Sequence, residues 1–136
     1  MKIFICTSKH LYQNIPPIKE KLEEKGHIIT LPNSFYTPEK EEEMKKSSAG
    51  DHKKYKEEMI RLQKEKVKAN DAILVLNMEK NGQKNYIGGA TFLEIYIAFD
   101  FGKKIFLYNE IPENLLKDEL LGMNPKIIHG NLELVV

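Results

Sequence analysis

The chain has 136 residues, the size of a single domain with its own hydrophobic core. Charged residues make up 30% of it and the formal net charge is +1, without the basic excess typical of nucleic-acid-binding proteins. The single cysteine, Cys6, excludes an internal disulfide and a cysteine-based zinc cluster, and the four histidines lack metal-ligand spacing. No apolar run reaches the roughly 18 residues of a membrane helix. We therefore expect a cytoplasmic protein with no metal, cofactor, nucleic-acid or membrane partner.

The first half of the chain predicts two strands and three helices. Residues 2–6 and 27–31 are short β-branched runs, and the helix between them opens at the Pro16-Pro17 pair. A second helix starts at Thr37 and carries acids at 39–43, where the helix dipole favours them. After the 47–50 break, a third helix covers 51–69 and turns Tyr55, Met59, Leu62 and Val67 inward.

The second half continues the alternation of strands and helices. Residues 71–77 form a continuously apolar strand, which suits the centre of a parallel sheet. A helix ending before Gly102 follows, then a strand at 104–108, a short helix at 112–121, and a fifth strand or C-terminal extension over 127–136. This order predicts a single α/β domain over 1–136, a flavodoxin/Rossmann-like three-layer sandwich with a five-stranded, mainly parallel sheet.

Glu94 is the most informative residue, because it lies in an otherwise apolar helix directly after Gly88-Gly89. A buried carboxylate is costly unless it has a partner or a function. One interpretation is a capping box, in which Thr91 is the N-cap and Glu94 folds back onto the backbone. The other is a ligand site, where the glycines let a ligand approach and the helix N-terminus keeps Glu94 ionised at neutral pH.

In a parallel α/β sheet, ligands bind beyond the carboxyl ends of the strands, where the strand order reverses. The first strand ends at Thr7 and Ser8, and the third leads into the Gly88-Gly89 loop. If these strands are neighbours, their ends line one crevice together with Glu94. Tyr12, in the loop after the first strand, is a further candidate for a hydrogen bond to a ligand.

The chain resembles the nucleoside 2-deoxyribosyltransferase superfamily, which includes the deoxynucleoside 5′-monophosphate N-glycosidases. The resemblance rests on the strand 3–8, on Asn70-Asp71 before the third strand, and on 89–98, followed by Gly102-Lys103. It covers most of the chain but is carried by few residues. The segment 89–98 is similar to the one that bears the family's nucleophilic glutamate.

The resemblance implies an enzyme that cleaves or transfers the N-glycosidic bond of a nucleoside or nucleotide. Glu94 would form a covalent glycosyl intermediate, and Asp71 would act as general acid and base on the leaving or incoming base. Gly88, Gly89 and Thr91 would line the substrate site, although the transferases carry an Asp and the monophosphate hydrolases a Ser where Gly88 stands. Asn124 would reach the site from a neighbouring subunit.

Two further expectations concern alternatives and assembly. The alternative to an enzyme is a non-catalytic nucleotide-binding or sensor protein on the same scaffold. Gly88 favours this alternative, because the carboxylate of the transferases is missing there. The presence of both Asp71 and Glu94 favours the enzyme. A second N-glycosidase family, the cytokinin-activating phosphoribohydrolases, is a poorer match, because Ile87 replaces a proline and one residue is missing before Thr91.

The Glu94 helix is apolar on nearly every side, which predicts a homodimer anchored by Tyr96, Phe99 and Phe101.

Overall fold

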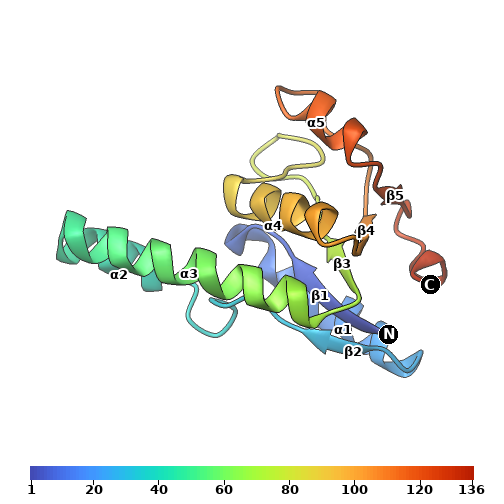
Figure 1. The fold of residues 1–136 in the computed structure, drawn as a ribbon, viewed down its shortest axis with the longest axis horizontal. Coiled ribbons are helices and arrows are strands. Elements are labelled where there is room, and N and C mark those ends of the chain that lie inside the picture. The colour runs from blue at the N-terminus through green and yellow to red at the C-terminus, as the bar shows by residue number, and fades with distance from the viewer.

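The computed structural model describes residues 1–136, and its chain alternates strands and helices throughout (Figure 1). In chain order the elements are β1 (Lys2–Cys6), the 3-10 helix η1 (Lys9–Asn14), α1 (Ile15–Glu24), β2 (Ile28–Thr30), α2 (Lys40–Ser47), α3 (Ala49–Ala69), β3 (Ala72–Val75), α4 (Gly89–Asp100), β4 (Lys104–Leu107), α5 (Lys117–Gly122), β5 (Lys126–Ile127) and the 3-10 helix η2 (Leu132–Leu134).

The five strands form one parallel sheet in the order β2-β1-β3-β4-β5. All four strand pairs are parallel, and β1 pairs with β3 in a register that places Ile5 opposite Leu74. β2 therefore lies on one side of β1, and β3, β4 and β5 follow one another on the other side. The predicted α/β class with a five-stranded parallel sheet is confirmed, and the reversal of strand order falls between β1 and β3.

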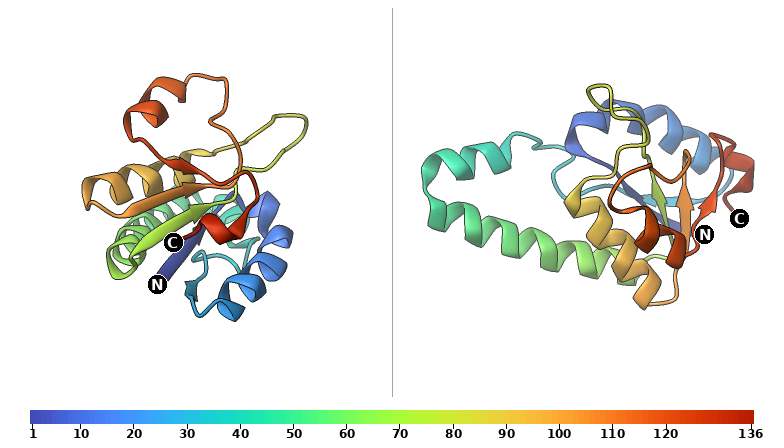
Figure 2. Two further views of the ribbon diagram at one scale, coloured as in Figure 1. Left: turned by 90° about the vertical axis from the view of Figure 1, so that its right-hand side faces the viewer. Right: turned by 90° about the horizontal axis from the view of Figure 1, so that it is seen from above.

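Alternate residues of the strands point to opposite faces of the sheet and build two separate cores. Ile3, Ile5 and Leu74 pack with the buried stripe of α1 on one face. On the other face, Phe4 and Ile73 pack with α3, α4 and α5, and Figure 2 shows the helices flanking the sheet on its two sides. Because β3 is covered on both faces, every one of its residues is buried, as its apolar run predicted.

Several local boundaries differ from the sequence prediction. The first loop forms η1, a 3-10 turn that the sequence did not indicate. The helix predicted from Thr37 begins at Lys40, and α3 is capped by Ser48, whose side chain accepts a hydrogen bond from the Asp51 backbone NH. The last strand is only two residues long, and the 3-10 helix η2 forms later in the segment that was expected to supply it.

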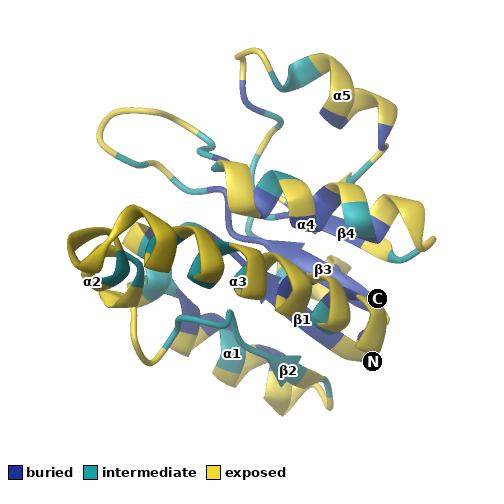
Figure 3. Ribbon diagram, turned by 60° about the vertical axis from the view of Figure 1, so that its left-hand side comes forward, coloured by how far each residue is buried: buried dark blue, intermediate teal, exposed yellow.

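The α2–α3 arm projects beyond the end of the sheet, as Figures 1 and 3 show. α2 has no buried residue, whereas the second half of α3 packs against the body of the protein. The buried positions of α3 are Gln63 and Val67, and the expectation that Leu62 faces inward is wrong, since its side chain is 40% exposed. No helix in the structure is both long and apolar enough to cross a membrane.

Candidate functional site

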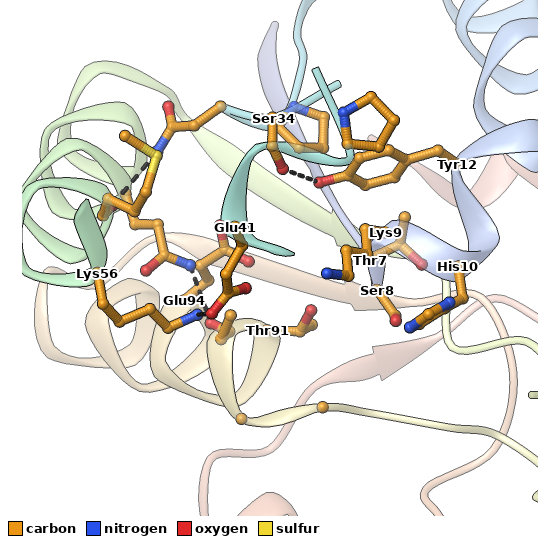
Figure 4. A pocket seen from close by; sticks show the side chains of 18 of the residues that line it. Thr7, Ser8, Lys9, His10, Tyr12, Ser34, Glu41, Lys56, Thr91 and Glu94 are labelled. Atoms are coloured by element: carbon orange, nitrogen blue, oxygen red, sulfur yellow. Dashed lines mark hydrogen bonds and ion pairs between the residues drawn. The ribbon is translucent and has the colours of Figure 1, made fainter. Parts of the chain in front are cut away.

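A cavity of about 320 Å³ opens where the strand order reverses, beyond the carboxyl ends of β1 and β3. Four parts of the chain contribute to its wall: the loop after β1, the loop after β2, the α2–α3 arm, and the segment from the β3–α4 loop into α4 (Figure 4). Of the residues predicted for the site, the cavity brings together Thr7, Ser8, Tyr12, Gly88, Gly89, Thr91 and Glu94.

Glu94 lies in the second turn of α4, because the helix begins at Gly89 and not after Thr91. The N-cap is Gly88, and no side chain caps the helix, so the capping-box interpretation of Thr91 and Glu94 is wrong. Instead, Thr91 and Glu94 are both buried at the cavity wall, and Glu94 is only 5% exposed. The carboxyl does not cap its own helix; it interacts with the Gln63 amide and the Cys6 thiol.

Burial decides the ionisation of Glu94. Desolvation raises the pKa of its carboxyl from 4.5 to about 7, against the opposing effects of the Gln63 amide, the Cys6 thiol and the charge of Lys66. The expectation that the helix N-terminus would keep this group ionised at neutral pH is therefore wrong. Near pH 7, the Glu94 carboxyl is therefore partly protonated and partly ionised. A pKa in this range suits a group that takes part in proton or glycosyl transfer.

Gln63 is a residue of the site that the sequence did not indicate. It sits on the inward stripe of α3, four residues before Val67, and is buried. Its Nε2 donates a hydrogen bond of 3.2 Å to the backbone carbonyl of Ala90 in the first turn of α4. An amide on the buried side of a helix was the only sequence signal for Gln63. Its partner, the Ala90 carbonyl, is brought to it by the packing of α3 against α4.

The segment after β1 contributes the hydroxyl groups of Thr7 and Tyr12, and both are already hydrogen-bonded within the protein. Thr7 is buried, and its Oγ1 donates a hydrogen bond of 2.8 Å to the carbonyl of Leu76 at the end of β3. Tyr12 and Ser34 share a hydrogen bond of 2.8 Å between their hydroxyls. This bond ties the first loop to the loop after β2, so the two loops form one wall of the cavity. Ser8 is half-buried in the same wall.

The Tyr86 side chain leaves little room for a side chain at position 88, which favours the glycine found there. A Cβ at position 88 would lie 3.3 Å from the Tyr86 hydroxyl, so a larger residue there would push the phenol aside. Lys80 lies over the Tyr86 ring, with its Nζ 4.4 Å from the ring centroid. At Gly89, by contrast, an added Cβ would meet no atom within 4 Å, so no crowding requires a glycine there.

The arm brings two further carboxylates to the cavity, each held by basic side chains. Glu41 Oε2 lies 3.0 Å from His52 Nε2 and 3.3 Å from Lys56 Nζ. Burial alone would raise the pKa of Glu41, but its hydrogen bonds with His52 and Lys56 bring the pKa below its ordinary value. Glu42 Oε1 lies 3.2 Å from the Nζ of Lys9 and 3.4 Å from that of Lys45.

Neither Asp71 nor Asn124 lines this cavity within its own chain. Asp71 precedes β3, at the amino-terminal edge of the sheet, where it is exposed and its Oδ2 accepts a hydrogen bond of 2.8 Å from the Lys2 backbone NH. The sheet separates it from Glu94, and the predicted pairing of the two acids is therefore wrong for this chain. Asn124 precedes β5 and lines a different hollow beside Lys104, and its contact with the site of a neighbouring subunit stays a prediction.

No group of three or more His, Cys, Asp or Glu side chains is placed to hold a metal ion. No protein-family model, curated protein or solved structure matches the chain.

The raised pKa of Glu94 predicts a stability that falls with pH. The folded protein binds this proton more tightly than the unfolded chain, so the contribution of Glu94 to the free energy of unfolding declines from pH 4.5 to about 7. The loss should be about 3 kcal/mol. Urea unfolding at several pH values should show it in the wild type but not in a Glu94→Gln variant, and parallel profiles would contradict it.

Proposed function

We propose that the protein cleaves or transfers the N-glycosidic bond of a nucleoside or nucleotide through a covalent glycosyl intermediate on Glu94. The observation that carries this proposal is a buried carboxylate at the wall of a cavity at the point of strand-order reversal. A carboxylate in that position is a suitable nucleophile, since the surrounding protein excludes water from it. The resemblance of 89–98 to the segment of a nucleophilic glutamate supports the same reaction.

The reaction begins with Glu94 ionised. An oxygen of its carboxylate attacks the anomeric carbon as the bond to the base breaks, through an oxocarbenium-like transition state. Water or a second base then displaces the sugar from Glu94 with a second inversion, so the anomeric configuration is retained. Gln63 supports this role by tying α3 to the first turn of the helix that carries Glu94, which fixes the direction of its side chain.

Base release and covalent trapping test this proposal. The protein is incubated with deoxynucleosides and their 5′-monophosphates, with and without a free acceptor base, and the released base is measured by chromatography. A slow 2-fluorinated substrate should add the mass of its sugar to a peptide that contains Glu94. A label on any other residue, or release of base without a labelled intermediate, would contradict the assignment.

A non-catalytic nucleotide-binding protein is the second candidate. It is favoured by the position of Asp71, which leaves Glu94 without the partner acid that the resemblance implied. Calorimetry with the same ligands separates the two functions. A binding protein would hold an intact nucleotide without releasing base, and Glu94→Gln would retain much of the affinity for that ligand.

We further infer that two copies of the chain associate through α4. Leu93, Tyr96 and Phe99, spaced three residues apart on α4, carry large apolar side chains that are 39%, 54% and 49% exposed. Replacing Tyr96 with Lys should convert a dimer into a monomer in light scattering at micromolar concentration. Tyr36→Lys, at a site 83% exposed on the loop after β2, is the matched control and should leave the dimer intact. A wild-type monomer would contradict this inference.

A further inference from the structure

Lys80 is the one lysine of the cavity wall that no carboxylate neutralises. Four lysines line the cavity, and the other three each form an ion pair with Glu41 or Glu42. Lys80 forms no ion pair, and its Nζ lies over the Tyr86 ring, 4.4 Å from the ring centroid. A positive charge without an anionic partner in the protein therefore borders the cavity.

A tight turn fixes the backbone of Lys80 beside the cavity. Lys80 and Gln83 exchange two backbone hydrogen bonds of 3.0 and 2.9 Å across Asn81-Gly82, whose φ angles of 49° and 81° are typical of an Asn-Gly hairpin turn. The Lys80 ammonium lies 3.4 Å from the Tyr86 hydroxyl. That hydroxyl in turn lies 3.3 Å from where a Cβ at position 88 would be, so the charge is close to the N-terminus of α4.

The N-terminus of α4 presents hydrogen-bond donors to the same cavity. No side chain caps the helix, and the backbone NH groups of Gly89, Ala90 and Thr91 have no acceptor within the protein. Thr91 is only 3% exposed, yet its hydroxyl also has no protein partner. Because no fully buried side-chain oxygen lacks a partner, the Thr91 hydroxyl must reach the cavity that this residue lines. These donors are therefore available to a ligand.

A phosphate group suits this combination of donors. A helix N-terminus stabilises an anion through its NH groups and its dipole, and an ammonium pairs with phosphate as a point charge. His10 lines the cavity from the segment after β1 (Figure 4). Desolvation, and then the charges of Lys80 and Lys9, lower the pKa of its imidazole. Two ammonium groups thus act on this part of the cavity.

We propose that Lys80 and Thr91, together with the first NH groups of α4, bind a phosphate carried by the substrate, and that Lys80 thereby selects nucleoside 5′-monophosphates over unphosphorylated nucleosides. This inference rests on the proposed function, which takes the substrate to be a nucleoside or nucleotide. Glu94 follows Thr91 by three residues, about one helical turn. The helix that binds the phosphate therefore also presents the carboxylate that attacks the sugar.

The selectivity for phosphate is measured by calorimetry at one ionic strength, with pairs of deoxynucleosides and 5′-monophosphates that share a base. The Glu94→Gln background prevents turnover of the ligand. Selectivity is the dissociation constant of the nucleoside divided by that of the monophosphate. It should be at least about 10-fold, and Lys80→Gln should lower it by about 10-fold, the effect of one hydrogen bond to a charged group. Thr91→Val, which removes the hydroxyl, should lower it by about 3-fold or more.

Lys84→Gln is the matched control for the change in charge. Lys84 belongs to the same loop but is exposed and does not line the cavity, so this substitution should change the selectivity by less than about 2-fold. Inorganic phosphate is a second probe. It should compete with the monophosphate, whereas phosphate that binds together with the nucleoside and strengthens its binding would be a separate reactant and would overturn the inference.

The remaining outcomes separate this inference from the proposed function. A selectivity near 1, or one that Lys80→Gln leaves unchanged, overturns the phosphate site, and the proposed function still stands if nucleosides release base and label Glu94 in the wild type. Selective binding of monophosphates that Lys80→Gln removes, without base release or a label, supports the phosphate site and overturns the proposed function. If neither member of any pair binds, both fall.

Discussion

Replacing Glu94 with Gln is expected to lower turnover by roughly 10⁴-fold or more, because the amide cannot form the glycosyl intermediate. The substitution preserves the size of the side chain, and no capping interaction is lost, since α4 has no side-chain cap. It also removes a carboxylate that burial disfavours, so the variant should fold and should be more stable than the wild type above pH 7. Single-turnover rates and urea unfolding measure the two effects on the same samples.

The control for this prediction is Glu65→Gln, the same chemical change at an exposed position of α3. It should leave both turnover and the free energy of unfolding close to wild type. Full activity in Glu94→Gln would refute the nucleophile. A loss of activity accompanied by unfolding would instead assign Glu94 a structural role that its raised pKa does not predict.

Replacing Asn77 with Leu is expected to destabilise the protein by about 3 kcal/mol. Asn77 is fully buried after β3, and its Nδ2 donates to the carbonyls of Asn109 and Glu110 at 3.0 and 2.9 Å. Its Oδ1 accepts a hydrogen bond of 2.8 Å from the Asn109 backbone NH. Leu has a similar size but leaves these backbone groups unpaired in the interior, which costs more than the lost bonds alone.

Urea unfolding at constant pH measures this effect, with the denaturant slope checked so that the change reports stability. Gln13→Leu is the matched control, because Gln13 is an exposed amide on η1, and that substitution should change the free energy of unfolding by less than about 0.5 kcal/mol. An Asn77→Leu variant as stable as the wild type would show that the ends of β3 and β4 hold together without this amide.

The strands and the long helices could be read from local patterns, because their signals lie within a few neighbouring residues. The run 72–76 is apolar and buried at every position, and its first four residues form β3. The predictions failed for the conformation of the first loop and for the length of the last strand. The 3-10 turn η1 replaced an expected loop, and β5 reached only two residues, with η2 later in the same segment.

The candidate site was predictable in part for the same reason. Glu94 and the glycines stood out because a carboxylate in an apolar helix is unusual by composition alone, and Thr7 and Ser8 followed from the rule that ligands bind beyond strand ends. Asp71 was misplaced because its sequence neighbourhood does not reveal which edge of the sheet it occupies. It lies before β3, whereas the cavity lies after that strand.

By itself, then, the sequence determined the alternation of strands and helices, the burial of β3 and the position of one acid in an apolar helix, since each depends on local periodicity and composition. Only the tertiary structure decided what that acid meets. The packing of α3 on α4 brought Gln63 to Glu94, and the arm placed Glu41 and Glu42 on the same cavity wall. The pKa of Glu94 follows from that burial, because desolvation is a property of the surrounding atoms and not of the residue's place in the chain.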